Sequence, residues 1–378
     1  MQVPLFETQW EESDLKAAEN VIKRGTYWAT GPEIKEFEKE LAHYFGRKYC
    51  VVFSSGTTAL HAVLLAYQIK PGDEVIVPAL TFISTANSVL FVGATPVFGD
   101  IEKDTYCLDA DDIERKLTDK TKVIMPVHYG GCPARDIEKI ASLAREKNIL
   151  LLEDAAAAHG ARINNKLAGT FGDAAMISFC QSKIISSGGE GGAIITDDID
   201  LYEKLKLLVS HGRADNKEYY SREDLFDYIH LGYNFRMPTI CAAIGLSQLK
   251  RIDKLIGMRK EVASMYTKEL QNISGVKPWI PPDNLYSVNW IYAMEVLDGK
   301  RAMLQKYLSE HGVSAKFYYN LIHKTKFYRD VLKIKADIPV TDECGSKLLS
   351  LPMSPVMTIE QINYVIETVK GFFSKHEI

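Results

Sequence analysis

The chain has 378 residues, a length that predicts two closely associated domains rather than one small module. Hydrophobic residues make up 46% and charged residues 25% of the chain, which excludes a disordered or fibrous protein. The formal net charge is -4 and is spread without long runs of one sign, so no basic field is available for non-specific binding of nucleic acid.

The sequence predicts neither export nor a membrane span. No window approaches about 18 consecutive apolar residues. Glu7, Glu11 and Glu12 stand where a signal peptide would carry basic and then apolar residues. We therefore expect a cytoplasmic protein without membrane partners. The six cysteines are too widely spaced for a CxxC pair, a zinc site or a dense disulfide framework, so we expect reduced thiols and no metal.

A helical arm is expected near the start, because Ile34, Phe37 and Leu41 recur at helical spacing and Gly46 is a suitable C-terminal stop. After it, short β-branched runs alternate with helix-like segments as far as residue 197. Such alternation is typical of an α/β fold with a mostly parallel sheet and helices on both faces. The seven expected strands span 49–53, 74–78, 95–99, 122–128, 149–154, 174–179 and 192–197.

The second half of the chain has a different pattern. Apolar spacing predicts one long helix, straight or bent, from residue 238 to about 271. A proline-rich stretch then leads into a strand and helices of α+β composition, expected at 289–296, 302–311 and 359–373. We therefore divide the chain into an arm with a large α/β domain, 1–245, and a linking helix with a smaller α+β domain, 246–378.

Polar groups follow two of the strands, at the sheet edge where open α/β folds bind ligands. Ser55, Gly56 and Thr57 open a helix, whose backbone N–H groups and partial positive charge suit a phosphate; a capped helix start is the alternative. Glu153 and Asp154 end an apolar strand. A buried acid needs a cation or a donor, and a protonated ring nitrogen would serve; a structural acid that caps the next turn is the alternative.

Two further segments carry reactive or charged side chains. Lys183 leaves an apolar strand for a glycine-rich loop, where desolvation would favour an imine-forming nucleophile, although most lysines are solvated surface residues. The glycines form neither a GxGxxG nor a Walker motif, so a dinucleotide or P-loop site is not expected. Asn234 and Arg236 precede the long helix, where they would bind a phosphate or a neighbouring chain, or simply form a turn.

In combination and order, these segments resemble the DegT/StrS family of pyridoxal phosphate-dependent sugar aminotransferases, which have fold type I of the aspartate aminotransferase superfamily. The resemblance covers almost the whole chain. It rests on Gly31, Phe37-Glu38, Ser55-Gly56-Thr57, residues 71–75, Thr81-Phe82, residues 93–97, Glu153-Asp154, Ser178-Phe179, Lys183, residues 189–192 and residues 232–237.

The resemblance implies a role for each matching residue. Lys183 would bind pyridoxal 5'-phosphate covalently and would be free in the half-reaction with pyridoxamine 5'-phosphate, while Asp154 would pair with the protonated ring nitrogen. Both would be catalytic. Asp154 would keep the ring nitrogen protonated so that the cofactor can act as an electron sink, and Lys183 would transfer protons. The remaining cofactor contacts would be Gly56, Thr57 and Ser178 at the phosphate, Phe82 on the ring, and Asn234 with Arg236 reaching across to the neighbouring subunit of a homodimer with shared sites.

The chain departs from the family pattern where the substrate would bind. Ala157 stands where the family often has a polar residue that touches the cofactor's phenolic oxygen. Residues 318–323 are similar to a Tyr-Pro-x-Pro-Leu-His segment but lack both prolines. His159, Tyr318 and His323 are the expected substrate residues. His128 is a further candidate, and for both His128 and His159 a structural histidine remains the alternative.

The implied reaction moves an amino group from an amino acid, L-glutamate, to a 3-keto or 4-keto deoxy sugar on a nucleotide. An alternative substrate is a keto-cyclitol or a related compound without a nucleotide. A dehydratase is disfavoured, because such members carry His where this chain has Lys183. A catalytically idle regulatory homologue is the other alternative, and it is disfavoured because it has no physical need for Lys183, Asp154 and the phosphate residues together.

Overall fold

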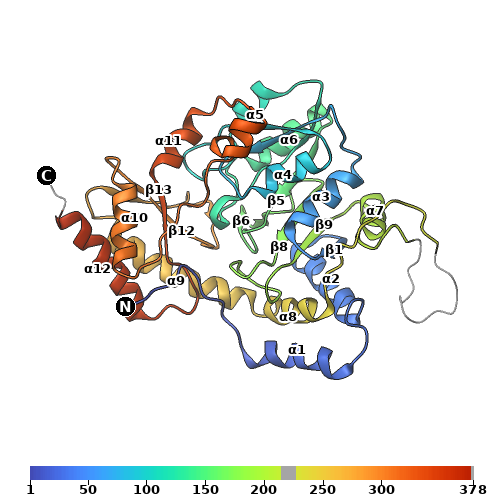
Figure 1. The fold of residues 1–378 in the computed structure, drawn as a ribbon, viewed down its shortest axis with the longest axis horizontal. Helices are drawn as coiled ribbons and strands as arrows, with labels where there is room; N and C mark the ends of the chain where they lie inside the picture. The colour runs from blue at the N-terminus through green and yellow to red at the C-terminus, as the bar shows by residue number, and fades with distance from the viewer. Residues whose placement is uncertain (214–226, 376–378) are drawn as a thin grey trace.

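A seven-stranded sheet forms the centre of the molecule in the computed structural model, which describes residues 1–213 and 227–375 (Figure 1). The strand order is β1-β9-β8-β5-β4-β2-β3; β9 is antiparallel to both of its neighbours, and the other pairs are parallel. The predicted mostly parallel sheet is therefore confirmed. The strands are β1 Tyr49–Phe53, β2 Glu74–Pro78, β3 Thr95–Gly99, β4 Thr121–Ile124, β5 Leu150–Asp154, β8 Ala174–Ser178 and β9 Gly192–Thr196.

Helices cover both faces of this sheet, because alternate side chains along each strand point to opposite faces. In β1, Val52 belongs to one buried core, and Val51 with Phe53 to another. The first core contains residues from α2 (Pro32–Phe45), α5 (Ala110–Lys116), α6 (Ile137–Lys147) and α8 (Thr239–Leu249). The second contains residues from α3 (Gly56–Ala66), α4 (Ser84–Phe91) and α7 (Ile199–Val209).

Three expected elements differ from the structure. The strand expected at 289–296 begins only at Tyr292. The strand expected at 122–128 ends at Ile124, because Pro126 has no N–H to donate to the ladder. The helix expected from 238 to 271 is two helices, α8 and α9 (Ile252–Leu270), with a break at Arg251. The guanidinium of Arg251 forms an ion pair there with Asp14 of α1 (Glu12–Arg24), so the break ties the N-terminal arm to the rest of the chain.

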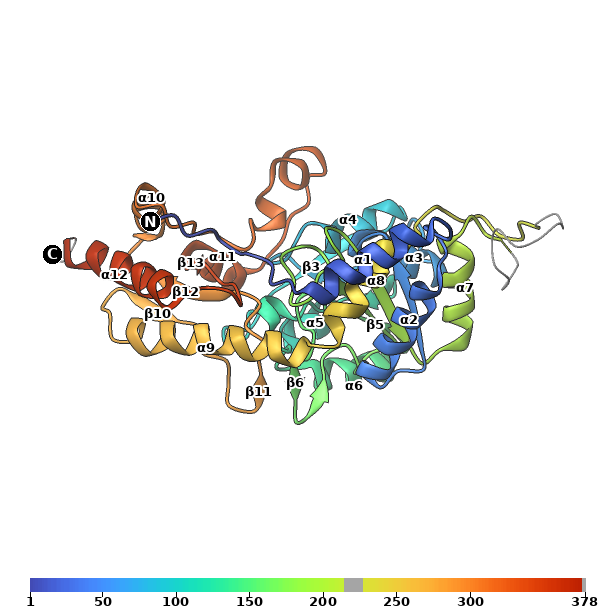
Figure 2. The ribbon, with the colours of Figure 1, turned by 90° about the horizontal axis from the view of Figure 1, so that it is seen from below.

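A second, smaller unit lies beyond α9, at the opposite end of the molecule from α7 (Figure 2). Its antiparallel sheet β10-β12-β13 and its helices enclose a third core, which also takes in Val3 near the N-terminus. The proposed boundary at residue 245 falls inside α8 and stays a prediction. The elements are β10 Val276–Pro278, β12 Tyr292–Val296, β13 Leu348–Leu351, α10 Arg301–Glu310, α11 Pro339–Lys347 and α12 Ile359–Lys375.

Three short strands form a separate small sheet in the order β11-β6-β7, so β11 from the second half of the chain pairs with β6 from the first. These strands are β6 Arg162–Ile163, β7 Lys166–Leu167 and β11 Leu285–Tyr286. Short 3-10 and π turns lie at Tyr129–Gly131, Ile322–Lys324 and Phe327–Val331. Among the helices of the described segments, none is both long and apolar enough to span a bilayer.

Candidate active site

The start of α3 lies against the end of β8, at the sheet edge where the sequence predicts a phosphate site. Gly56 is the first residue of α3, and a Cβ placed on it would lie 3.0 Å from Sδ of Met176 and 3.4 Å from Cβ of Ser178. Ser55 caps the helix by accepting a hydrogen bond from the Thr58 N–H at 3.1 Å. The capped helix start, expected as the alternative, is thus present, and it holds Gly56 beside Ser178.

The first turn of α3 also meets the start of α4. The hydroxyl groups of Thr57 and Ser84 lie 2.7 Å apart. The side chains of Thr57, Ser84 and Ser178 therefore lie close to Gly56 at the N-terminus of α3. We call these four residues the polar cradle. Backbone N–H groups at a helix N-terminus carry partial positive charge and favour an anion.

The two acids at the end of β5 have different surroundings. Glu153 is fully buried and accepts hydrogen bonds from the N–H groups of Gly169, Phe171 and Gly172 at 2.8, 2.6 and 2.7 Å. A fourth bond, 2.8 Å long, joins it to Nε2 of His128. Burial raises the pKa of Glu153, but these hydrogen bonds outweigh burial and hold the pKa below its usual range. Glu153 is therefore a structural acid.

His128, which the sequence offered as a pocket candidate, belongs to the same structural network. The N–H of Ala134 donates to Nδ1 of His128 at 2.9 Å, so Nδ1 carries no proton and Nε2–H donates to Glu153. The ring is fully buried. Here the alternative, a structural histidine, is the correct interpretation.

Asp154 is also buried, yet it makes fewer hydrogen bonds. Its carboxylate accepts from the Thr85 hydroxyl at 2.8 Å and from the Ala156 N–H at 3.2 Å. Burial raises the pKa of Asp154, and those two bonds together with the nearby Lys183 oppose the rise. Neither of its two donors is a cation, so this carboxylate can accept a positively charged partner.

Lys183 follows the end of β8, the strand beside β5, and lies in the loop before β9. Burial lowers the pKa of Lys183 to about 8, while Asp154, Cys180 and Glu190 act in the opposite direction. A substantial fraction of the amine is therefore neutral near physiological pH, as a nucleophile or general base requires. Across adjacent strand ends, Asp154 thus raises the pKa of Lys183 and Lys183 lowers that of Asp154.

The ring of Trp290 contacts Lys183, and this contact had not been predicted from the sequence. The Trp290 ring centroid lies 3.8 Å from Nζ of Lys183. Tyr319 lies between Trp290 and Phe82, with ring centroids 6.3 and 5.8 Å away. Burial, with neighbours that include Asp154, raises the pKa of Tyr319 well above its usual value, so its hydroxyl stays protonated. Phe82 is 55% exposed beside this group.

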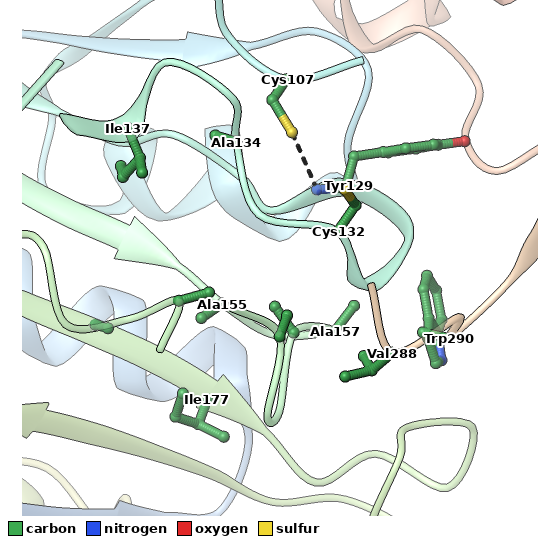
Figure 3. Packing of buried hydrophobic residues seen from close by; sticks show 14 of the residues in the cluster. Cys107, Tyr129, Cys132, Ala134, Ile137, Ala155, Ala157, Ile177, Val288 and Trp290 are labelled. Carbon is green, nitrogen blue, oxygen red and sulfur yellow. Dashed lines mark hydrogen bonds between the residues drawn. The ribbon is translucent and has the colours of Figure 1, made fainter. Parts of the chain in front are cut away.

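The chain directly after β5 is packed into an apolar cluster (Figure 3). Ala155 and Ala157 lie there among Ile177, Val288 and Trp290. A Cβ on Gly131 would lie 3.1 Å from the carbonyl oxygen of Ala157, so the backbones approach closely. The small side chain at 157, where the family often has a polar residue, is therefore part of this close packing.

The three expected substrate residues lie in different surroundings. His159 is fully buried beside Phe179, and burial, with the nearby charge of Lys183, lowers its pKa to about 3. Tyr318 packs on Trp290 with ring centroids 5.3 Å apart, so it adjoins the group around Lys183. His323 instead binds Asp342 at 3.0 Å and lies against Phe98 of β3, toward the edge of the sheet.

Asn234 and Arg236 lie on a segment that passes the polar cradle. Ser54 donates its N–H to the carbonyl oxygen of Phe235 at 2.8 Å, so the segment is anchored just before the start of α3. Asn234 is exposed, and Arg236 donates to the Ser210 hydroxyl at 3.1 Å. These two residues are therefore beside the cradle of their own chain.

The model of the DegT/DnrJ/EryC1/StrS aminotransferase family matches residues 8–370, so the chain belongs to this family and is an aminotransferase. It is 38% identical over 348 residues to the GDP-perosamine synthase of Caulobacter vibrioides, covering 90% of this chain and 91% of that one. It is 34% identical over 362 residues to the dTDP-3-amino-3,6-dideoxy-alpha-D-galactopyranose transaminase of Aneurinibacillus thermoaerophilus, covering 96% of each chain.

The fold is also shared with a solved enzyme structure. Helicobacter pylori PseC, an aminotransferase involved in the biosynthesis of pseudoaminic acid, superposes with a TM-score of 0.92 at 27% sequence identity. The match covers 99% of this chain and 100% of PseC. The fold type and family expected from the sequence are thus confirmed.

Proposed function

We propose that this member of the DegT/DnrJ/EryC1/StrS family transfers an amino group to a keto group of a deoxy sugar carried on a nucleotide, with pyridoxal 5'-phosphate as cofactor. The observation that carries the proposal is the meeting of Lys183 and Asp154 at adjacent strand ends, beside the cradle of Gly56 and Ser178. The names of the two relatives support it, since each combines a nucleotide with an amino sugar. L-glutamate is the proposed donor, and carbon 3 or 4 carries the keto group.

The residues present fit this cofactor. Asp154 accepts hydrogen bonds only from uncharged donors among the described residues, and a protonated ring nitrogen would give it a cationic partner. Glycine at position 56 lets the N-terminus of α3 lie close to Ser178, so a phosphate bound by the helix N–H groups would also be held by Thr57 and Ser178. Phe82 would stack on the ring.

When bound, the cofactor supplies an electron sink for the carbanion that forms as the donor loses its α proton. Asp154 holds a proton at the ring nitrogen, because its carboxylate is buried and favours a cationic partner. Lys183 takes up and gives back the proton that moves during the transfer, since its lowered pKa leaves part of the amine neutral. Trp290 and Tyr319 limit the access of water to Nζ.

Chemical reduction of the loaded protein tests the role of Lys183. Borohydride should fix the cofactor on Lys183, and peptide mapping should find the label there alone. Lys206 is a matched control, because it is another partly buried lysine but forms an ion pair with Glu38 at 3.4 Å. Lys206→Ala should keep the label and Lys183→Ala should lose it. A label on any other lysine would show that the assignment is wrong.

The substrate class is tested with a panel of keto compounds and L-glutamate. Nucleotide-linked 3-keto and 4-keto sugars should accept the amino group, and the matching free sugars and keto-cyclitols should react far more slowly. Faster amination of a keto-cyclitol would reject the nucleotide-sugar proposal. No transfer to any of them, despite a cofactor fixed on Lys183, would favour the idle homologue.

We also propose a homodimer in which Asn234 and Arg236 contact the cofactor phosphate of the neighbouring subunit. Asn234 is exposed beside the cradle, and Leu231, three residues earlier, is 77% exposed. An exposed apolar side chain next to a polar binding group suits a subunit interface. Two-fold symmetry would make the sharing of sites reciprocal.

Mixed dimers test this sharing. A Lys183→Ala chain is exchanged with a chain that carries Asn234→Ala and Arg236→Ala, each inactive as a homodimer. If the sites are shared, each mixed dimer has one site with every lesion and one intact site, so activity recovers. No recovery after proven subunit exchange would mean that each chain builds its own site.

The proposal also includes a cellular location and a division into domains. We place the enzyme in the cytoplasm. We divide the chain into domains 1–245 and 246–378. Fractionation of cells and limited proteolysis would test these two points separately.

A further inference from the structure

The indole of Trp290 is held against the segment that carries Lys183. Its Nε1–H donates to the carbonyl oxygen of Ser182 at 2.6 Å, and the centroid of its ring lies 3.8 Å from Nζ of Lys183. Trp290 is 5% exposed. The ring face therefore meets the amine directly in a site with little water, where attraction between a cation and a ring is strongest.

The position of the ring is fixed from several sides. The Trp290 carbonyl oxygen accepts a hydrogen bond from the buried Arg259 at 3.2 Å. Tyr318 and Tyr319 flank the indole with centroids 5.3 and 6.3 Å away. Because the ring is restrained by these contacts and the lysine side chain has four rotatable bonds, Lys183 is the mobile partner of this pair.

We propose that the indole face of Trp290 is the resting position of the Lys183 ε-ammonium whenever this lysine is not bonded to the cofactor. Trp290 is then a positioning residue, which holds the amine near the reacting carbon and favours its protonated form. The inference rests on the proposed function of Lys183. It assigns to Trp290 an effect on the proton affinity of Lys183.

The charged groups around Lys183 explain why an aromatic ring beside Nζ would stabilise its protonated form. Asp154 on β5, Cys180 on the same loop and Glu190 before β9 favour the ammonium, whereas burial favours the amine. His159 adds no positive charge, since burial lowers its pKa to about 3 and the ring stays neutral. When Asp154 pairs with a cationic ring nitrogen, its attraction for Lys183 weakens. The indole face does not titrate, and so it still stabilises the proton on Nζ.

The test measures the proton affinity of Lys183 rather than turnover. The protein loaded with pyridoxamine 5'-phosphate, which leaves Lys183 unbonded, is labelled with acetic anhydride from about pH 6 to pH 10, and the rate for the Lys183 peptide gives its pKa. Trp290→Phe and Trp290→Leu both lose the bond to Ser182, but only the Phe variant keeps a ring face. Lys206 serves as the internal control peptide.

We expect the Lys183 pKa to fall by about one unit in Trp290→Leu and by less than half of that in Trp290→Phe. A pKa in the Leu variant equal to or above that in the Phe variant would overturn the proposal. If Trp290→Leu does not fold, Trp290→Met provides the same comparison, since its flexible side chain fills the volume without a ring.

The outcome is separable from that of the proposed function. If Lys183 does not hold the cofactor, borohydride labels another residue, whatever the pKa values in the Trp290 variants. If Trp290 has no such role, borohydride still labels Lys183 while the two pKa values coincide.

Discussion

Glu153 and Asp154 are adjacent acids, and exchanging each for its amide should have opposite consequences. In Glu153→Gln, one carboxylate oxygen becomes an NH2 group that faces two donors, either the N–H groups of Phe171 and Gly172 or those of Gly169 and His128. Each buried donor left unsatisfied costs about 1–3 kcal/mol, so the free energy of unfolding should fall by about 2–6 kcal/mol.

His128 cannot relieve this loss by changing its tautomer. Its Nδ1 already accepts a hydrogen bond from the Ala134 N–H, so a proton moved to Nδ1 would break that bond. With an unfolding entropy of about 2.1 cal/mol/K per residue, 378 residues give about 0.8 kcal/mol/K. The midpoint of thermal unfolding of the cofactor-free protein should therefore fall by about 3–8 °C, as measured by calorimetry.

Asp154→Asn is the matched control. Because burial raises the pKa of Asp154, its charge costs folding free energy, and a neutral amide can still bond with Thr85 and Ala156. The midpoint should stay unchanged or rise, while the half-reaction with glutamate should slow by about 100-fold to 1000-fold, as expected for losing a buried charged partner. The reasoning is refuted if Glu153→Gln leaves the midpoint unchanged, or if Asp154→Asn lowers it more.

Three further predictions concern Lys183 and Gly192. The half-reaction rate should rise about tenfold per pH unit up to about pH 8 and then level off, because Nζ must be neutral and its pKa is about 8; a flat stopped-flow profile would contradict this. The pKa of Lys183 is about 8 in the folded chain and 10.5 in the unfolded chain, so between these pH values the unfolded chain binds more protons. The free energy of unfolding should therefore rise with pH from about pH 8 to pH 10.5, and Lys183→Met should make this rise smaller. Gly192→Ala would place a Cβ 2.6 Å from the backbone of Ser55 and Gly56, so the affinity for the cofactor should fall at least tenfold in a fluorescence titration. Gly257→Ala is the control, because the space around Gly257 is open, and it should leave this affinity unchanged.

Much of the fold follows from local pattern. The strands of the large sheet carry β-branched runs bounded by turns, and their expected positions agree with the structure to within one residue, except for the strand that Pro126 ends early. The contact that Arg251, at the break between α8 and α9, makes with Asp14 was not predictable, because the two residues are far apart in the sequence. Periodicity describes neighbours along the chain, whereas that contact is tertiary.

The residues of the site could be predicted only where they lie at the end of an expected strand or just after it. Gly56 and Lys183 follow strands and Asp154 ends one, so sheet topology brings the three residues to one edge. Trp290 gave no signal, because its hydrogen-bond partner Ser182 lies 108 residues earlier. Thr85 was missed for the same reason, since it meets Asp154 from a different strand–helix unit.

The two acids of β5 illustrate what strand geometry adds to a motif. Successive side chains in a strand point to opposite faces, and Leu151 and Leu152 belong to different cores. Glu153 and Asp154 therefore cannot serve one ligand together. Glu153 is turned toward the loop that includes Gly169, which it fixes through backbone hydrogen bonds, and Asp154 toward the opposite side. Because its neighbour anchors the strand end so firmly, Asp154 can keep a buried, incompletely paired carboxylate in place for a cationic partner.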